Sequence, residues 1–134
     1  MNSNLIGKVV VWALAFYFII SGLLAAFDVD AKLIRIGLSA VNGDGKIAFI
    51  LIYTSMMVGI GVAMLFMLYI FKSCRPSLVL AGTIVFSFII FRIIGSFVIG
   101  EFSSTQIGFL LTEVVELAII LVILFKVGKE VEVS

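Results

Sequence analysis

The stretch 77–99, SLVLAGTIVFSFIIFRIIGSFVI, decides the fold of this chain. It is long and apolar enough to cross a membrane as a helix, which takes roughly 20 residues. Its one ionisable side chain is Arg92. Pro76 stands just before it, where the first turn of a helix tolerates a residue without an N–H. A helix is expected because lipid offers no partner to an unpaired backbone group.

Three more stretches share this apolar character. Together with the first they predict four membrane spans, at 5–27, 47–71, 77–99 and 107–126. The composition agrees, because 63% of the residues are hydrophobic and 13% are charged, whereas soluble domains carry about 25% charged residues. The sequence therefore predicts an all-α membrane protein, with residues 1–134 forming one antiparallel bundle of four transmembrane helices.

Lysines and arginines are spread unevenly over the two ends of the predicted bundle. The end with both termini carries Lys8, Lys72, Arg75, Lys126 and Lys129, and the other end carries Lys32, Arg35 and Lys46. Cytoplasmic connections are the richer ones in these residues. We therefore expect both termini in the cytoplasm, and we refer to the opposite end as the outer end.

The longest connection, 28–46, holds three acids and three bases. Within it, the stretch 32–38 reads KLIRIGL. Basic and apolar residues alternate there in a pattern that is typical of a short amphipathic segment at the membrane interface. We expect this segment to lie flat at the outer end of the bundle.

Three charged residues fall inside the predicted spans and away from their cytoplasmic ends, where each costs about 2.5–3.5 kcal/mol on insertion scales and usually has a partner. If the third and fourth helices fold back at Ser104, Arg92 and Glu116 lie at the same depth, and Glu113 lies one turn nearer the surface. Arg92 is then expected to meet one or both carboxylates. A guanidinium fork fits a carboxylate at two points.

This group of charges has two interpretations. In the first, a buried salt bridge fixes the register of the third and fourth helices. In the second, the excess of two acids over one base leaves a carboxylate to bind a cation or a proton, or Arg92 holds an anionic ligand. The sequence leaves both open.

Hydroxyl groups gather at the same depth, in the outer half of every predicted helix. The candidate site residues that join the three charges are Tyr17, Tyr53, Ser96 and Thr112. The inner half is almost purely aliphatic and aromatic, so this asymmetry predicts a polar pocket that opens outward. The alternative is that each hydroxyl only bonds the carbonyl of the preceding turn, as is common in membrane helices.

The second helix carries small residues at intervals of four: Ser55, Gly59 and Ala63. Ridges of this kind let two membrane helices approach closely. We expect the ridge to pack inside the bundle or against a neighbouring copy of the chain.

Several classes of function are disfavoured. The chain has no histidine, which is the commonest general base and metal ligand. Its one cysteine, Cys74, is interpreted as an unreactive loop thiol. We therefore predict no metal, no cofactor and no catalytic residue, and an enzyme is the least favoured class. The net charge of +1 argues against a nucleic-acid partner.

The second half of the chain resembles a known family. The run Phe91-Arg92-Ile93-Ile94-Gly95-Ser96, followed by Gly100 and by Glu116 in the last helix, is similar to domain-of-unknown-function family 4345. Before Tyr53 the chain departs from that family, which tends to have an acid and an arginine where 49–51 reads FIL. The resemblance covers about 40–125. It implies a small four-helix protein of the bacterial inner membrane, with several spans.

Two functional hypotheses follow. The first is a non-catalytic bundle whose outward-facing polar pocket binds a small or lipid-like ligand, or a partner membrane protein. The second is a small ion-coupled transporter that works as an oligomer, with Glu113 or Glu116 as the coupling carboxylate. The expected partners are the lipid bilayer, the ligand and either a second copy of the chain or another membrane protein.

Overall fold

The structure is a computed structural model that describes residues 3–101 and 103–132, with side chains for 4–101 and 103–128. All its regular elements in those ranges are helices. They are α1 (Ser3–Phe27), α2 (Val29–Ile36), α3 (Gly43–Phe49), the π-helix η1 (Ile50–Thr54), α4 (Ser55–Phe71), α5 (Arg75–Ile99) and α6 (Ser104–Glu132). The predicted all-α fold is confirmed.

Four of these helical segments are long and apolar enough to span a membrane: Asn4–Phe27, Gly43–Phe71, Arg75–Ile99 and Ser104–Gly128. The second one is continuous through α3, η1 and α4. It begins four residues before the predicted span because Asn42 accepts a hydrogen bond from the backbone N–H of Gly45, which caps the helix. The prediction of four helices that are long and apolar enough to span a membrane is confirmed, and their boundaries differ from the predicted ones by a few residues.

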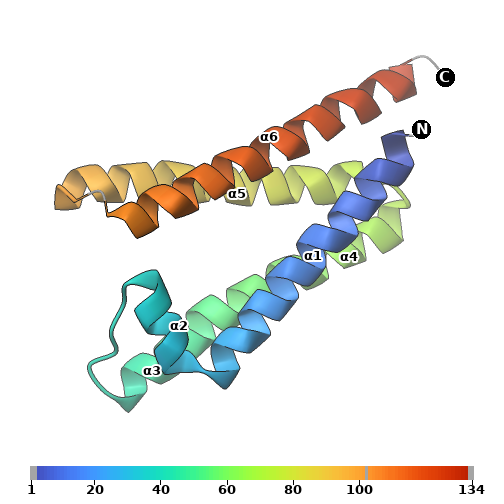
Figure 1. Cartoon of the computed structure of the whole chain (residues 1–134). Coiled ribbons are helices and arrows are strands. Elements are labelled where there is room, and N and C mark those ends of the chain that lie inside the picture. The colour runs from blue at the N-terminus through green and yellow to red at the C-terminus, as the bar shows by residue number, and fades with distance from the viewer. Residues whose placement is uncertain (1–2, 102, 133–134) are drawn as a thin grey trace.

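The long helices form two antiparallel pairs, α1 with α4 and α5 with α6. Figure 1 shows that the pairs meet at the end that holds both termini and the α4–α5 connection, and that they splay apart at the other end. Side chains from all four long helices fill the closed end, among them Val11, Met64, Leu78 and Ile120. The predicted apolar inner half is therefore the packed core, and the outer half is open.

The α2 helix lies at the open end and packs against α1. Asp28 caps its first turn by accepting from the N–H of Ala31, and Gly37 ends it in the left-handed conformation with a φ of 77°. Leu33 is buried while Ile34 is exposed. The predicted amphipathic segment is thus a short helix, which starts three residues earlier than the pattern suggested.

Gly61 makes a close approach between α1 and α4. A Cβ placed there would lie 2.6 Å from the backbone oxygen of Ala15. The sequence had suggested that the Ser55–Gly59–Ala63 ridge packs inside the bundle or against a neighbouring copy. Gly59 makes no close contact inside the bundle, because a Cβ there would meet nothing within 4 Å, and packing against a neighbouring copy stays a prediction.

These two glycines give a matched pair of substitutions. We expect Gly61→Ala to lower the free energy of unfolding by about 1–3 kcal/mol, because a methyl group that meets a fixed carbonyl forces the helices apart. Gly59→Ala is expected to stay within about 1 kcal/mol of the wild type. Thermal unfolding in one detergent measures both. Equal losses would show that Gly61 is not the contact point.

Cys74 lies in a buried position between the closed ends of α1 and α5. Its Sγ donates to Asn4 Oδ1 at 3.5 Å, and a Cβ on Gly7 would lie only 2.4 Å from that sulfur. Burial raises the pKa of the Cys74 thiol. Because the thiolate is the reactive form, these surroundings agree with an unreactive thiol.

Candidate functional site

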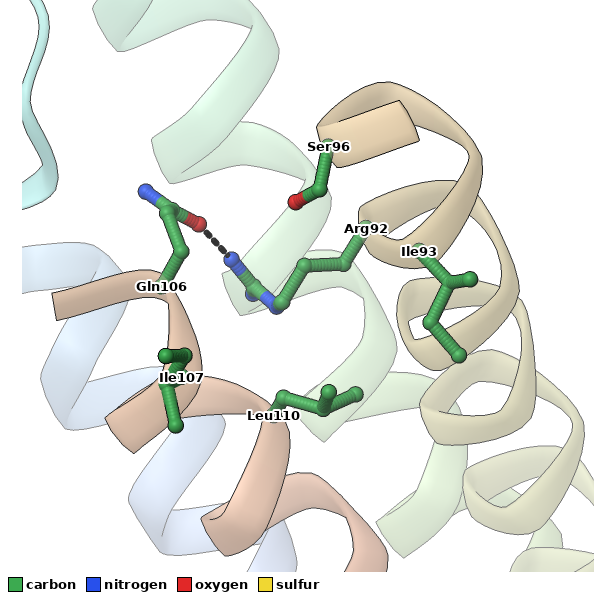
Figure 2. A pocket seen from close by; sticks show the side chains of 6 residues that line it. All are labelled: Arg92, Ile93, Ser96, Gln106, Ile107 and Leu110. Atoms are coloured by element: carbon green, nitrogen blue, oxygen red, sulfur yellow. Dashed lines mark hydrogen bonds between the residues drawn. The ribbon is translucent and has the colours of Figure 1, made fainter. Parts of the chain in front are cut away.

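The guanidinium of Arg92 contacts three side chains of α6. Its Nε and Nη2 donate to the two carboxylate oxygens of Glu113, at 3.0 and 2.5 Å, and its Nη1 donates to Gln106 Oε1. Its Cζ lies 5.2 Å from the ring centroid of Phe109. Figure 2 shows the guanidinium reaching from α5 across to Gln106. All three nitrogens are therefore engaged within the protein.

The partner of Arg92 is Glu113, one helical turn before Glu116. From the sequence, the chain was expected to fold back at Ser104 between the third and fourth helices, and Glu116 was therefore predicted to lie at the depth of Arg92. That fold point was wrong, because α6 already begins at Ser104, where the Ser103 hydroxyl accepts from Gln106 N. Gly100 ends α5 with a φ of 76°. The turn is thus centred nearer to α5, and this moves Glu113 to the depth of Arg92.

Glu116 is left without the arginine. Its Oε1 is buried and accepts no hydrogen bond from any residue that the structure describes. Glu113 is the other carboxylate on this face of α6, and it is already paired with Arg92. The predicted excess of acid over base at this level therefore resides on Glu116.

A large groove opens between the two helix pairs. Its volume is about 930 Å³, and α1, α2, α4, α5 and α6 all contribute to its lining. Most of its surface is apolar, supplied by residues that include Phe18, Leu24, Met56, Met57, Phe88 and Phe109. The groove follows from the splay of the pairs, since no helix fills the space between them at the open end.

The structure brings six of the seven candidate site residues to this groove: Tyr17, Tyr53, Arg92, Thr112, Glu113 and Glu116. Ser96 is the exception. It lies buried beside Arg92 in a separate cavity of about 10 Å³, which has room for about one water molecule. Thr112 Oγ1 donates to the Gly108 carbonyl at 3.0 Å, as the alternative interpretation of the hydroxyls expects.

A π-helical turn presents Tyr53 to the groove. Residues 50–54 form η1, and the Tyr53 ring stacks on Phe49 with their centroids 5.0 Å apart. Thr54 Oγ1, in the same turn, is buried without a hydrogen-bond partner among the described residues. Single π-turns inside helices occur frequently at functional sites. On the facing helix α1, Tyr17 lines the same groove.

Sequence reasoning missed three residues that matter here. Gln106 had been placed in a turn, yet it lies two helical turns before Glu113 on the same face of α6, and this spacing was the available signal. Lys32 and Arg35 line the groove from α2. Nothing in the spacing of residues connects α2 with the last helix, so only the tertiary structure reveals their position.

No known protein family, no curated protein and no solved structure matches this chain.

Proposed function

We propose that this chain is a non-catalytic protein of the bacterial inner membrane, with both termini in the cytoplasm, and that its groove binds a lipid-like ligand. The observation that carries this proposal is the groove itself. Ligand sites are concave, mostly apolar, and about 300–1,000 Å³ in volume, with a few convergent polar groups. The groove of about 930 Å³ fits that description. The location and orientation rest on the charge count and on the resemblance to the 4345 family.

Arg92 was expected as a possible contact for an anionic ligand, but the structure leaves other groups to contact a ligand. Arg92 is committed to Glu113 and Gln106, so its role is to fix the register of α5 and α6. Among the candidate site residues named from the sequence, those that face the groove and still have a polar group free for a ligand are Glu116 and the two tyrosines. We therefore assign ligand contact to this set and to the apolar lining.

Filling the groove tests the proposal. Thr112 is exposed and lines the groove, so Thr112→Trp is expected to weaken the binding of an amphiphile by about a hundredfold. Thr83 supplies the matched control, because its hydroxyl also donates to the carbonyl four residues earlier but it lies away from the groove. The readout is the fluorescence of a monoacylglycerol with a labelled acyl chain, titrated into the purified protein.

A second candidate function is an ion-coupled carrier that uses Glu116. It is favoured by one observation, the buried Oε1 that no hydrogen bond satisfies. Intramembrane carboxylates often belong to proton relays. We expect Glu116→Gln to lower proton movement across proteoliposomes, and Glu101→Gln, in the exposed α5–α6 turn, to leave it unchanged. If the wild type moves no more protons than empty liposomes, the carrier is excluded.

A further inference from the structure

Two bases of α2 line the groove without a carboxylate partner. Lys32 and Arg35 stand one turn apart on α2, which places them on the same side of that helix. No salt bridge joins either of them to an acid in the part of the chain whose side chains the structure describes. The third base of the same connection differs, because Lys46 pairs with Asp30 at 2.7 Å and does not line the groove.

The contacts of Lys32 are to neutral groups. Its Nζ donates to Ser21 Oγ at 3.4 Å and lies 5.1 Å from the ring centroid of Tyr53. Of the acids that line the groove, Asp28 is the nearest to Lys32 in sequence. Its Oδ1 accepts a hydrogen bond from the backbone N–H of Ala31 at 3.0 Å. The ammonium is therefore positioned over the groove by a hydroxyl and a ring, and neither of them neutralises its charge.

The balance of acids and bases that line the groove changes sign along its length. At the open end, where α2 lies, Lys32 and Arg35 outnumber Asp28, the cap of that helix. Deeper in the groove, Glu113 and Glu116 of α6 outnumber Arg92. An anionic group is attracted to the open end and repelled from the deeper part, while an apolar chain is accepted throughout. The arrangement orients an amphiphile with its headgroup at α2.

We propose that the groove selects a phospholipid whose headgroup carries a net negative charge, and that Lys32 and Arg35 bind its phosphate. This inference rests on the proposed function and names its ligand class. Basic pockets among transmembrane helices are suited to phosphate headgroups, and the arginine fork matches phosphate oxygens in two places. Met56 and Met57 line the apolar part, and flexible thioether side chains adapt to acyl chains of different shape.

The test compares two lipids with identical acyl chains. Fluorescent phosphatidylglycerol and phosphatidylcholine are titrated into the purified full-length protein in a neutral detergent. We expect Lys32→Gln and Arg35→Gln each to weaken phosphatidylglycerol binding about fivefold, and the double variant about thirtyfold. Phosphatidylcholine carries the same phosphate together with a positive choline, so we expect each variant to weaken its binding less than that of phosphatidylglycerol.

Lys46→Gln is the matched control, because it removes one positive charge from the same connection outside the groove. We expect it to leave phosphatidylglycerol binding unchanged. A loss equal to that of Lys32→Gln would overturn the inference, since it would show only diffuse attraction to an anionic surface.

The groove-filling variant separates this inference from the function on which it rests. If Thr112→Trp weakens both lipids but the charge variants leave the preference for phosphatidylglycerol intact, the groove binds lipid and the headgroup assignment is overturned. If Thr112→Trp weakens neither lipid, both proposals fail. Loss of both lipids in Thr112→Trp, with selective loss in the charge variants, supports both.

Discussion

Replacing Glu113 by Gln is expected to lower the free energy of unfolding by about 3 kcal/mol, because it leaves the Arg92 guanidinium buried without a counter-charge. The two side chains are only 23% and 12% exposed. Both oxygens of Glu113 accept from Arg92, so the amide loses the charge and one of the two acceptors. Glu116→Gln removes a carboxylate of the same helix that has no such partner.

The comparison of these two variants makes the prediction specific. We expect Glu116→Gln to stay within about 1 kcal/mol of the wild type, because it breaks no ion pair. A double variant, Arg92→Met with Glu113→Met, is expected to recover most of the loss, since apolar residues often replace a buried pair at little cost. Thermal unfolding in a single detergent, followed by circular dichroism, measures all three. Equal destabilisation by the two glutamine variants would contradict the assigned pairing.

The spans could be predicted because each rests on local information. Length and apolar content decide whether a helix can cross the membrane, and caps such as Asn42 and Gly100 decide where it begins and ends. The predicted and observed boundaries differ by a few residues. The caps at Asn42 and Ser103 start α3 and α6 a few residues before the apolar stretches that follow them.

The gathering of polar residues was partly predictable, whereas their pairing was not. Depth along a helix can be counted, and it brought Tyr17, Tyr53 and Thr112 to the same level as the intramembrane charges. The choice between Glu113 and Glu116 depends on a turn of a few residues. An error of three residues in that turn exchanges one carboxylate for the other.

Tertiary packing determined what the sequence could not predict. Gly59 and Gly61 have similar surroundings in sequence, yet only Gly61 faces Ala15 across the α1–α4 contact. The splay of the two helix pairs creates the groove, and a long connection returns α2 to its open end. Contacts of this kind join residues far apart in the chain, so no local pattern reports them.

Occupation of the groove by a ligand is the central claim, and Thr112→Trp has the largest expected effect on it. An indole at this exposed position takes up space that the apolar part of a ligand would fill. Burying one large apolar group is worth about 1.5–3 kcal/mol, and the upper end of that range corresponds to about a hundredfold in affinity. Thr83→Trp adds the same ring to α5 outside the groove.

The most direct measurement is therefore the affinity of these two variants and the wild type for the labelled monoacylglycerol. This probe has no net charge, so the result does not depend on the headgroup assigned to Lys32 and Arg35. The account predicts a loss of about a hundredfold in Thr112→Trp and wild-type affinity in Thr83→Trp. Unchanged affinity in Thr112→Trp, or equal losses in both variants, would contradict the claim that the groove is the binding site.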